Sequence, residues 1–159
     1  MKNQTIYEIL KLAAAIALCH LAGIIGSLFT VTSSGSWYET IIKPSFNPPG
    51  WVFGPVWLTL YTLMGISLYL VWRSGNRDWI VFGVFGLQLV LNALWSILFF
   101  GIQSPVYAFI EIIFLWAAII ASIVLFFRVS KTAAYLLIPY ALWVSFAAFL
   151  NFTIWRLNK

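Results

Sequence analysis

The sequence contains little charge. Nine Lys or Arg and four Asp or Glu make up 8% of the 159 residues, whereas 63% are hydrophobic and the mean hydropathy is +0.98. A water-soluble domain of this size needs a more polar surface, so the composition indicates an integral membrane protein. The net charge of +5 is spread singly over the ends of apolar runs, unlike the clustered charge of a nucleic-acid-binding protein. Nucleic acid is therefore not an expected partner.

Cysteine and histidine each occur once. Cys19 has no second cysteine, which excludes an internal disulfide and a thiolate metal site. His20 is either hydrogen-bonded to a neighbouring helix or a haem ligand, although nothing supplies a second axial ligand. A Ser-His-Asp set, metal-ligand spacing and a phosphate loop are also missing, so conventional acid–base or metal catalysis has no groups to use. We expect no metal site and no intrinsic cofactor.

The sequence does contain apolar runs long enough to cross a bilayer. A hydrocarbon core of about 30 Å takes about 20 apolar residues in a helix, and five such runs lie at 6–30, 52–72, 80–100, 106–127 and 133–154. The last three connectors are too short for anything but antiparallel neighbours. The sequence predicts an all-α fold, a single membrane domain over residues 1–159 with five transmembrane helices.

Lysine and arginine are unevenly divided between the two sides of this topology. One side receives Lys2, Lys11, Arg73, Arg77, Arg128 and Lys131, and the other receives Lys43, Arg156 and Lys159. Because basic residues accumulate in cytoplasmic loops, we expect a multi-pass protein of the cell membrane with a cytoplasmic N-terminus. The first run exceeds a signal-peptide core, so it is interpreted as a retained span.

The connector at 31–51 differs from the others. From Trp37 to Trp57 the chain reads WYETIIKPSFNPPGWVFGPVW, with four prolines, two glycines and three tryptophans. Proline fixes its own backbone angle and moves the preceding residue out of the helical region, so the loop is stiff yet irregular. Such a loop is suited to covering something. Trp51, at its junction with the second run, either points into the bundle or anchors the helix end at the membrane interface.

Amide and aromatic side chains lie inside the apolar runs on shared helix faces, namely Gln88, Asn92 and Trp95 in the third run and Tyr140, Trp143, Ala147 and Asn151 in the fifth. These faces would be expensive to turn toward lipid, so they line a cavity or bond neighbouring helices. The indoles of Trp95, Trp116 and Trp143 each need a hydrogen-bond partner or a ligand. Glu111, near the start of the fourth run, should be paired, protonated or facing a polar cavity, with Tyr107 as one partner to consider.

Several of these segments resemble one family. Trp37-Tyr38, Lys43-Pro44, Phe46, Pro48-Pro49, Trp51, Phe53 and Pro55-Val56-Trp57 are similar to the signature of the translocator protein family, also called the tryptophan-rich sensory protein or TspO/MBR family. Gln88 to Ser96 and Pro139 to Asn151 resemble the same family, so the resemblance extends over most of the chain. It implies a bacterial member that binds tetrapyrroles such as protoporphyrin IX or haem, and synthetic benzodiazepine-site ligands.

The resemblance also implies roles for individual residues. A ligand cavity under the first loop would involve Trp51, Phe53, Pro44, Pro48, Tyr61, Gln88, Asn92, Trp95, Tyr140, Trp143, Ala147, His20 and Gly23. Trp51 and Trp143 would take a photochemical role in light-dependent oxidative degradation of protoporphyrin. A homodimer would form through Gly83 and Gly86, since small residues let helices approach closely. Phe152 stands where mammalian relatives have the tyrosine of a proposed cholesterol motif, which puts sterol recognition in doubt.

Three functions are therefore open. The protein would be a receptor or transporter-like protein that binds tetrapyrroles and promotes their photo-oxidation. It would alternatively be a sensory protein that reports ligand occupancy to a partner, or a lipid or sterol transporter without chemistry. An apolar, flat-walled cavity with few polar groups suits a large planar hydrophobic ligand but does not identify it.

Overall fold

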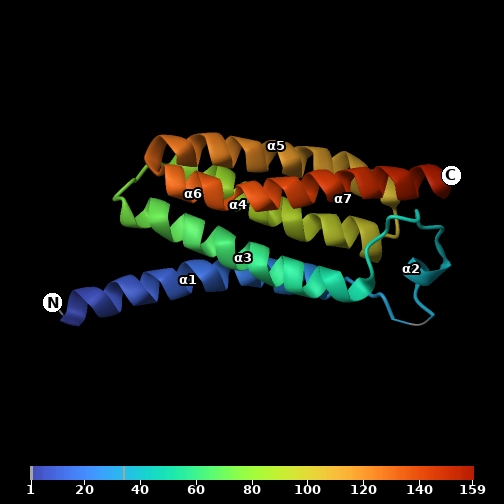
Figure 1. The fold of residues 1–159 in the computed structure, drawn as a ribbon, viewed down its shortest axis with the longest axis horizontal. Coiled ribbons are helices and arrows are strands. Elements are labelled where there is room, and N and C mark those ends of the chain that lie inside the picture. The colour runs from blue at the N-terminus through green and yellow to red at the C-terminus, as the bar shows by residue number, and fades with distance from the viewer. Residues whose placement is uncertain (1, 34) are drawn as a thin grey trace.

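The structure, a computed structural model, describes residues 2–33 and 35–159 (Figure 1). These residues form helices without strands, which confirms the all-α prediction. The elements are α1 (Lys2–Ser27), α2 (Trp37–Thr40), α3 (Gly50–Arg73), α4 (Trp79–Ser96), the π-helical segment η1 (Ile97–Gly101), α5 (Pro105–Val129), α6 (Lys131–Leu136) and α7 (Ile138–Leu157).

Five stretches of the described chain are long and apolar enough to cross a membrane: Gln4–Ser27, Gly50–Arg73, Trp79–Gly101, Pro105–Val129 and Lys131–Leu157. They confirm the five predicted spans to within a few residues. The first span ends at Ser27 rather than at Thr30, because the backbone hydrogen bonds then shorten to three-residue steps. Phe29 N–H donates to the Gly26 carbonyl at 3.2 Å and Thr30 N–H to the Ser27 carbonyl at 3.1 Å.

The fifth span consists of two helices, α6 and α7, that meet at Leu137. Pro139 has no N–H to donate one turn back, so the regular helical pattern stops there. Leu137 N–H donates instead to the Ala134 carbonyl at 3.1 Å, and the pattern resumes with Ala141 N–H donating to the Leu137 carbonyl at 3.0 Å. A tighter local turn at Leu137 therefore accommodates Pro139.

The two termini lie at opposite ends of the bundle (Figure 1). The N-terminal end also carries the α3–α4 and α5–α6 connections, with Arg73, Arg77, Arg128 and Lys131. The other end carries the long loop and the C-terminus, with Lys43, Arg156 and Lys159. The prediction of a cytoplasmic N-terminus is based on this separation of basic residues.

Lys11 lies inside the first span and is accommodated by neighbouring side chains. Its Nζ forms a salt bridge with Glu8 Oε1 at 3.0 Å and lies 5.8 Å from the centre of the Trp72 ring. Tyr69 donates a hydrogen bond to the other Glu8 oxygen at 3.2 Å. The pair is therefore tied to α3 near the N-terminal end of the bundle.

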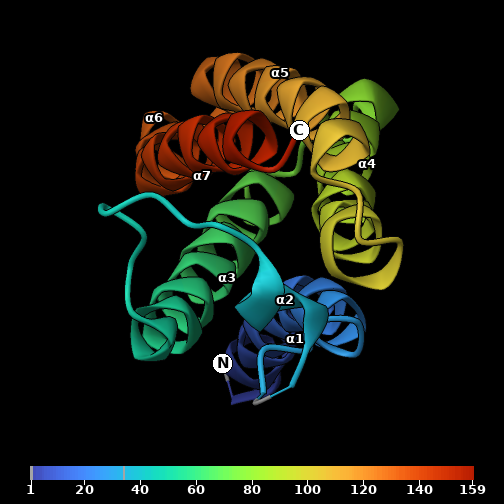
Figure 2. The same ribbon diagram turned by 90° about the vertical axis from the view of Figure 1, so that its right-hand side faces the viewer.

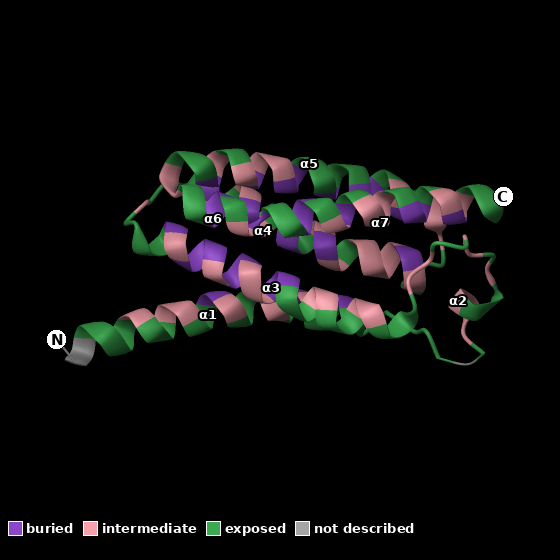
Figure 3. Ribbon diagram, in the orientation of Figure 1, coloured by how far each residue is buried: buried purple, intermediate pink, exposed green. Residues whose placement is uncertain are grey.

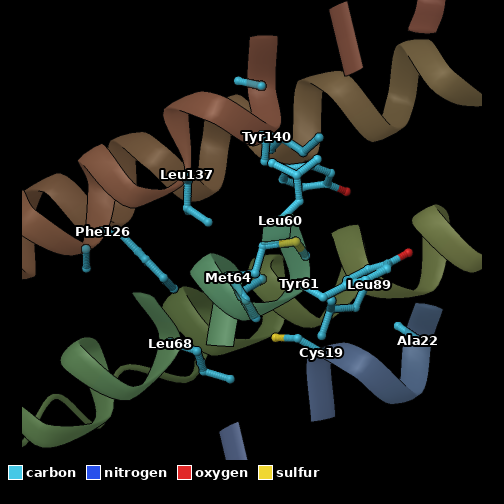
Figure 4. Close-up of a cluster of buried hydrophobic side chains, with 14 of the residues drawn as sticks. Cys19, Ala22, Leu60, Tyr61, Met64, Leu68, Leu89, Phe126, Leu137 and Tyr140 are labelled. Carbon is cyan, nitrogen blue, oxygen red and sulfur yellow. The ribbon is translucent and has the colours of Figure 1, made fainter. Parts of the chain in front are cut away.

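Buried residues lie toward the interior of the bundle and exposed residues on its outside (Figure 3). Many of the exposed residues are large and apolar. Leu142 is 67% exposed and Phe114 is 63% exposed. Such a surface is unfavourable in water but matches the hydrocarbon of a bilayer. The interior is shown in Figure 4, where Cys19 of α1, Met64 of α3 and Tyr140 of α7 are among the buried side chains.

Two glycines permit the close approach of α1 and α3. A Cβ at Gly65 would lie 2.5 Å from Ile16 Cα, and a Cβ at Gly23 would lie 2.7 Å from Tyr61 Cζ. Real Cβ atoms essentially never come this close, so a side chain at either position would force its neighbour to move. Gly23 of α1 and Gly65 of α3 thus serve helix packing within the chain.

The loop between α1 and α3 crosses the end of the bundle (Figure 2). Trp37 and Tyr38 of α2 pack on Phe99 of η1, with ring centres 5.7 and 6.3 Å apart. Phe46 stacks on Phe149 of α7 at 5.3 Å. These contacts hold the loop against the third and fifth spans.

Candidate functional site

A cavity of about 520 Å³ lies inside the bundle beneath the loop. Pockets for drug-sized ligands have volumes of about 300–1,000 Å³. Every span contributes to the walls. The lining residues are Gly23 and Ser27 of α1; Thr30, Thr32, Tyr38, Glu39 and Lys43 of the loop; Gly50, Phe53, Gly54, Trp57 and Tyr61 of α3; Asn92, Trp95, Ser96, Phe99 and Phe100 of α4 and η1; Ile112 and Leu115 of α5; and Trp143, Val144, Ala147, Leu150, Asn151 and Ile154 of α7.

Aromatic rings form much of the cavity wall. Trp57 and Tyr61 stack with ring centres 5.3 Å apart and an interplanar angle of 24°. Phe53 of α3 meets Trp143 of α7 edge to face at 6.0 Å. The spacing explains the α3 contribution, because positions 53, 57 and 61 repeat every four residues and share one helix face. Flat apolar rings suit a planar hydrophobic ligand.

A buried polar network crosses the bundle at Asn92. Tyr61 donates a hydrogen bond to Asn92 Oδ1, and Asn92 Nδ2 donates to the Tyr140 hydroxyl at 3.0 Å. The network joins α3, α4 and α7, so the amide predicted for this helix face both lines the cavity and bonds its neighbours. Asn92 thus has both of the roles predicted for this face, lining a cavity and bonding neighbouring helices.

Trp95 and Asn151 form a second interhelical link. Trp95 Nε1 donates to Asn151 Oδ1 at 3.0 Å, and Asn151 Nδ2 donates to the Pro105 carbonyl at 2.8 Å. This satisfies the indole of Trp95 within the protein. Trp116 is satisfied similarly, because its Nε1 donates to Ser145 Oγ at 2.8 Å.

The π-helical segment η1 shapes the wall next to the loop. Ile102 N–H donates to the Ile97 carbonyl at 2.8 Å, a five-residue step. The wider turn brings two consecutive residues, Phe99 and Phe100, to the cavity. Single π turns inside α-helices often occur at functional sites.

The mouth of the cavity is polar and belongs to the loop. Tyr38, Glu39 and Lys43 line it. Burial raises the pKa of the Tyr38 phenol, and its hydroxyl donates a hydrogen bond to Asn47 Oδ1 at 3.3 Å. The Tyr38 hydroxyl is therefore neutral at physiological pH. Lys43 Nζ lies 4.5 Å from the centre of the Tyr38 ring, within cation–π distance.

Seven of the predicted ligand residues line the cavity: Gly23, Phe53, Tyr61, Asn92, Trp95, Trp143 and Ala147. Pro44 and Pro48 lie in the loop outside the lining set. Tyr140 is buried behind the cavity, where it bonds Asn92. Tyr140 therefore contributes to the cavity indirectly, through its hydrogen bond with Asn92.

Trp51 is 77% exposed and does not line the cavity. The interpretation that its indole points into the bundle is wrong in this structure. Position 51 is the second residue of α3, and helix periodicity directs it away from the face formed by Phe53 and Trp57. Its exposure agrees with the alternative, an anchor at the membrane interface.

His20 contacts the neighbouring helix rather than the cavity. Its Nε2 lies 3.1 Å from Thr62 Oγ1, and the Thr62 hydroxyl donates to the Leu58 carbonyl at 2.8 Å. Because Thr62 uses its proton on Leu58, His20 Nε2 is the donor to the Thr62 oxygen. His20 therefore forms a hydrogen bond to a neighbouring helix, one of the two roles predicted for it.

Gln88 and Glu111 are buried at 1% and 6% exposure. Hydrogen bonds among the described residues reach neither amide atom of Gln88 and neither carboxylate oxygen of Glu111, so Tyr107 is not a partner. A carboxyl buried in this way favours its neutral form. Neither residue lines the cavity.

Some lining residues were not predicted as part of a site. Lys43 and Tyr38 belong to the family-like motif, and their place in the motif was the available signal. Phe99 and Phe100 had no such signal, because the π turn that brings both rings to the cavity was not predicted from the sequence. In the part of the chain that is described, no group of three His, Cys, Asp or Glu residues is arranged to hold a metal ion.

Comparison with known proteins gives consistent matches along the chain. The sequence profile of the TspO/MBR family matches residues 15–156. The tryptophan-rich protein TspO of Chlorobaculum tepidum is 47% identical over 154 residues, which covers 95% of this chain and 98% of the relative. The protein of the same name from Archaeoglobus fulgidus is 48% identical over 152 residues, covering 95% and 99%. The translocator protein of Homo sapiens is 38% identical over 138 residues, covering 84% and 82%.

Proposed function

The chain belongs to the TspO/MBR family, and we propose that its cavity binds tetrapyrroles, with protoporphyrin IX and haem as the expected ligands. The observation that carries the proposal is a cavity of about 520 Å³ walled by flat aromatic rings from three spans and α2. A planar macrocycle buries its faces against such rings and leaves its polar substituents for the mouth. The protein would act as a membrane receptor or transporter for this ligand.

Of the two tryptophans expected to have a photochemical role, Trp143 is better placed than Trp51. It lines the cavity, and its ring meets that of Phe53 at 6.0 Å. Among the described hydrogen bonds, none has the Trp143 indole as donor, whereas Trp95 donates to Asn151. A bound porphyrin absorbs light, and a neighbouring indole can supply an electron while dioxygen serves as the oxidant. Light-dependent degradation of protoporphyrin is therefore part of the proposal, with Trp143 as the nearer donor and Trp51 as the remote one.

The same cavity is the proposed site for synthetic benzodiazepine-site ligands, which are also apolar and aromatic. A homodimer through α4 is proposed as well. A Cβ at Gly86 would meet no atom within 4 Å, and one at Gly83 would reach only Trp79 of its own helix at 4.0 Å. These glycines do not serve packing within the chain, so their surface is free for a second copy.

Filling the cavity tests the proposal. Ala147 of α7 lines the cavity, so Ala147→Trp should weaken protoporphyrin IX binding at least tenfold, measured by quenching of tryptophan fluorescence in detergent. Leu142→Trp is the matched control, because residue 142 lies on the same helix, is 67% exposed and is not a lining residue. Circular dichroism and thermal melting report whether each variant is folded, and Ala147→Leu provides a smaller block. Wild-type affinity in both folded Ala147 variants would exclude this cavity as the tetrapyrrole site.

A further inference from the structure

Lys43 is a cation at the cavity mouth, and none of the acids in the described part of the chain forms a salt bridge with it. It is half-buried and lines the cavity. Its Nζ lies 4.5 Å from the centre of the Tyr38 ring and 3.5 Å from the Ile41 carbonyl. Within the described chain Lys43 forms no salt bridge, whereas Lys11 pairs with Glu8. A partly desolvated ammonium group of this kind gains more from an anion than a fully solvated one.

The backbone around Lys43 is fixed on both sides. Ile42 N–H donates to Asn158 Oδ1 at 2.9 Å, and Asn158 Nδ2 donates to the Ile42 carbonyl at 2.8 Å. The side chain of Asn158 thus pairs with both backbone polar groups of Ile42, the residue before Lys43, although Asn158 and Ile42 are 116 positions apart in sequence. Pro44 follows and restricts the backbone of Lys43 to extended conformations. A preorganised cation loses less entropy when it binds an anion.

Polar side chains line the loop end of the cavity, and the walls within the spans are mostly apolar apart from groups such as Tyr61 and Asn92, which bond each other. Ser27, Thr30 and Thr32 join Lys43 at the loop end, whereas Ile112, Leu115 and Val144 line the walls within the spans. A ligand that matches this distribution has an apolar body and an acidic group at one edge. Glu39, also at the mouth, accepts a hydrogen bond from Gly35 N–H at 2.9 Å.

We infer that the cavity selects hydrophobic carboxylic acids, with the ligand carboxylate paired to Lys43 and with Asn158 holding the loop segment that carries Lys43. This inference rests on the proposed function, because the apolar body would be the tetrapyrrole. The inference adds to the proposed function that the ligand carries a carboxylate at one edge and that Lys43 binds this carboxylate. Asn158 is a positioning residue.

Comparing the binding of protoporphyrin IX with that of its dimethyl ester separates the contribution of the carboxylates from that of the macrocycle. The two molecules share the ring system, but the ester has no anionic group. We expect the wild-type protein to bind the acid about tenfold more tightly than the ester, a ratio that corresponds to about 1.4 kcal/mol. In Lys43→Gln this ratio should fall to about one, and Lys43→Arg should retain most of it, because arginine keeps the charge.

Lys159→Gln is the matched control for general electrostatics. Lys159 lies at the same end of the protein, and its Nζ lies 4.4 Å from the centre of the Trp155 ring, but it does not line the cavity. Its acid-to-ester ratio should equal that of the wild type. Asn158→Ala should lower the ratio partially, because Lys43 keeps its charge but loses its fixed position.

The outcomes separate the two proposals. If neither the acid nor the ester binds the wild-type protein, the proposed function fails. If both bind with equal affinity, or if folded Lys43→Gln keeps the tenfold preference, tetrapyrrole binding stands and the role of Lys43 is overturned. An equal loss of preference in Lys43→Gln and Lys159→Gln would also overturn it, because the effect would then come from net charge.

Discussion

Replacing Gly65 by alanine tests whether the close approach of α1 and α3 holds the bundle together. A Cβ at this position would lie 2.5 Å from Ile16 Cα, 2.8 Å from Ile16 Cγ1 and 2.9 Å from Ile16 N. Ordinary contacts of a Cβ begin at 3.4 Å. Two of the three neighbouring atoms are backbone, so the clash cannot be relieved by rotating a side chain. The two helices have to move apart.

Two opposing effects set the size of the change. Alanine in place of glycine inside a helix gains about 0.8–1.0 kcal/mol of intrinsic helix stability. Overpacking a well-packed core costs about 1–3 kcal/mol, and backbone neighbours place this substitution toward the upper end of the range. The expected net effect of Gly65→Ala is a decrease of about 1–2 kcal/mol in the free energy of unfolding.

Gly86→Ala is the control, because it lies inside a helix and a Cβ there would meet no atom within 4 Å. It should increase the free energy of unfolding by about 0.5–1 kcal/mol. The assay is equilibrium unfolding in mixed micelles with increasing SDS, followed by far-ultraviolet circular dichroism at protein concentrations where the chain is monomeric. The two variants should differ by about 1.5–3 kcal/mol. Equal stabilisation of both would refute the close contact between α1 and α3.

Two further predictions concern topology and photochemistry. Cysteines placed at Ser45 and Asn76 in a Cys19→Ser background should react with a membrane-impermeant maleimide from opposite sides of the membrane, since the loop and the α3–α4 connection lie at opposite ends; labelling of both from one side would contradict the five-span topology. Because Trp143 lines the cavity and Trp51 is 77% exposed, Trp143→Phe should slow light-dependent loss of bound protoporphyrin more than Trp51→Phe. The measurement is the rate per bound porphyrin under fixed illumination, and the reverse order would make Trp51 the main electron donor.

Composition and periodicity alone determined the class of protein, the number of spans and most of the helix faces. Long apolar runs have one stable form in hydrocarbon, the helix, because every backbone polar group must be satisfied within the segment. For the same reason Asn92, Trp95 and Trp143 could be assigned to an inward face: turning amides and indole N–H groups toward lipid is expensive. The helix break before Pro139 was also predictable, since it follows from a missing N–H.

Only the tertiary structure decided which inward-facing residues reach the cavity. Gln88 shares a face with Asn92 but lies one turn deeper and is closed off by packing. Trp51 and Phe53 are two residues apart, yet the rotation of α3 sends one outward and the other into the cavity. The pairing of Asn158 with Ile42 joins segments 116 positions apart in sequence, so a local sequence pattern cannot predict it. The mouth of the site, including Lys43, exists because the loop is held across the end of the bundle by contacts with η1 and α7.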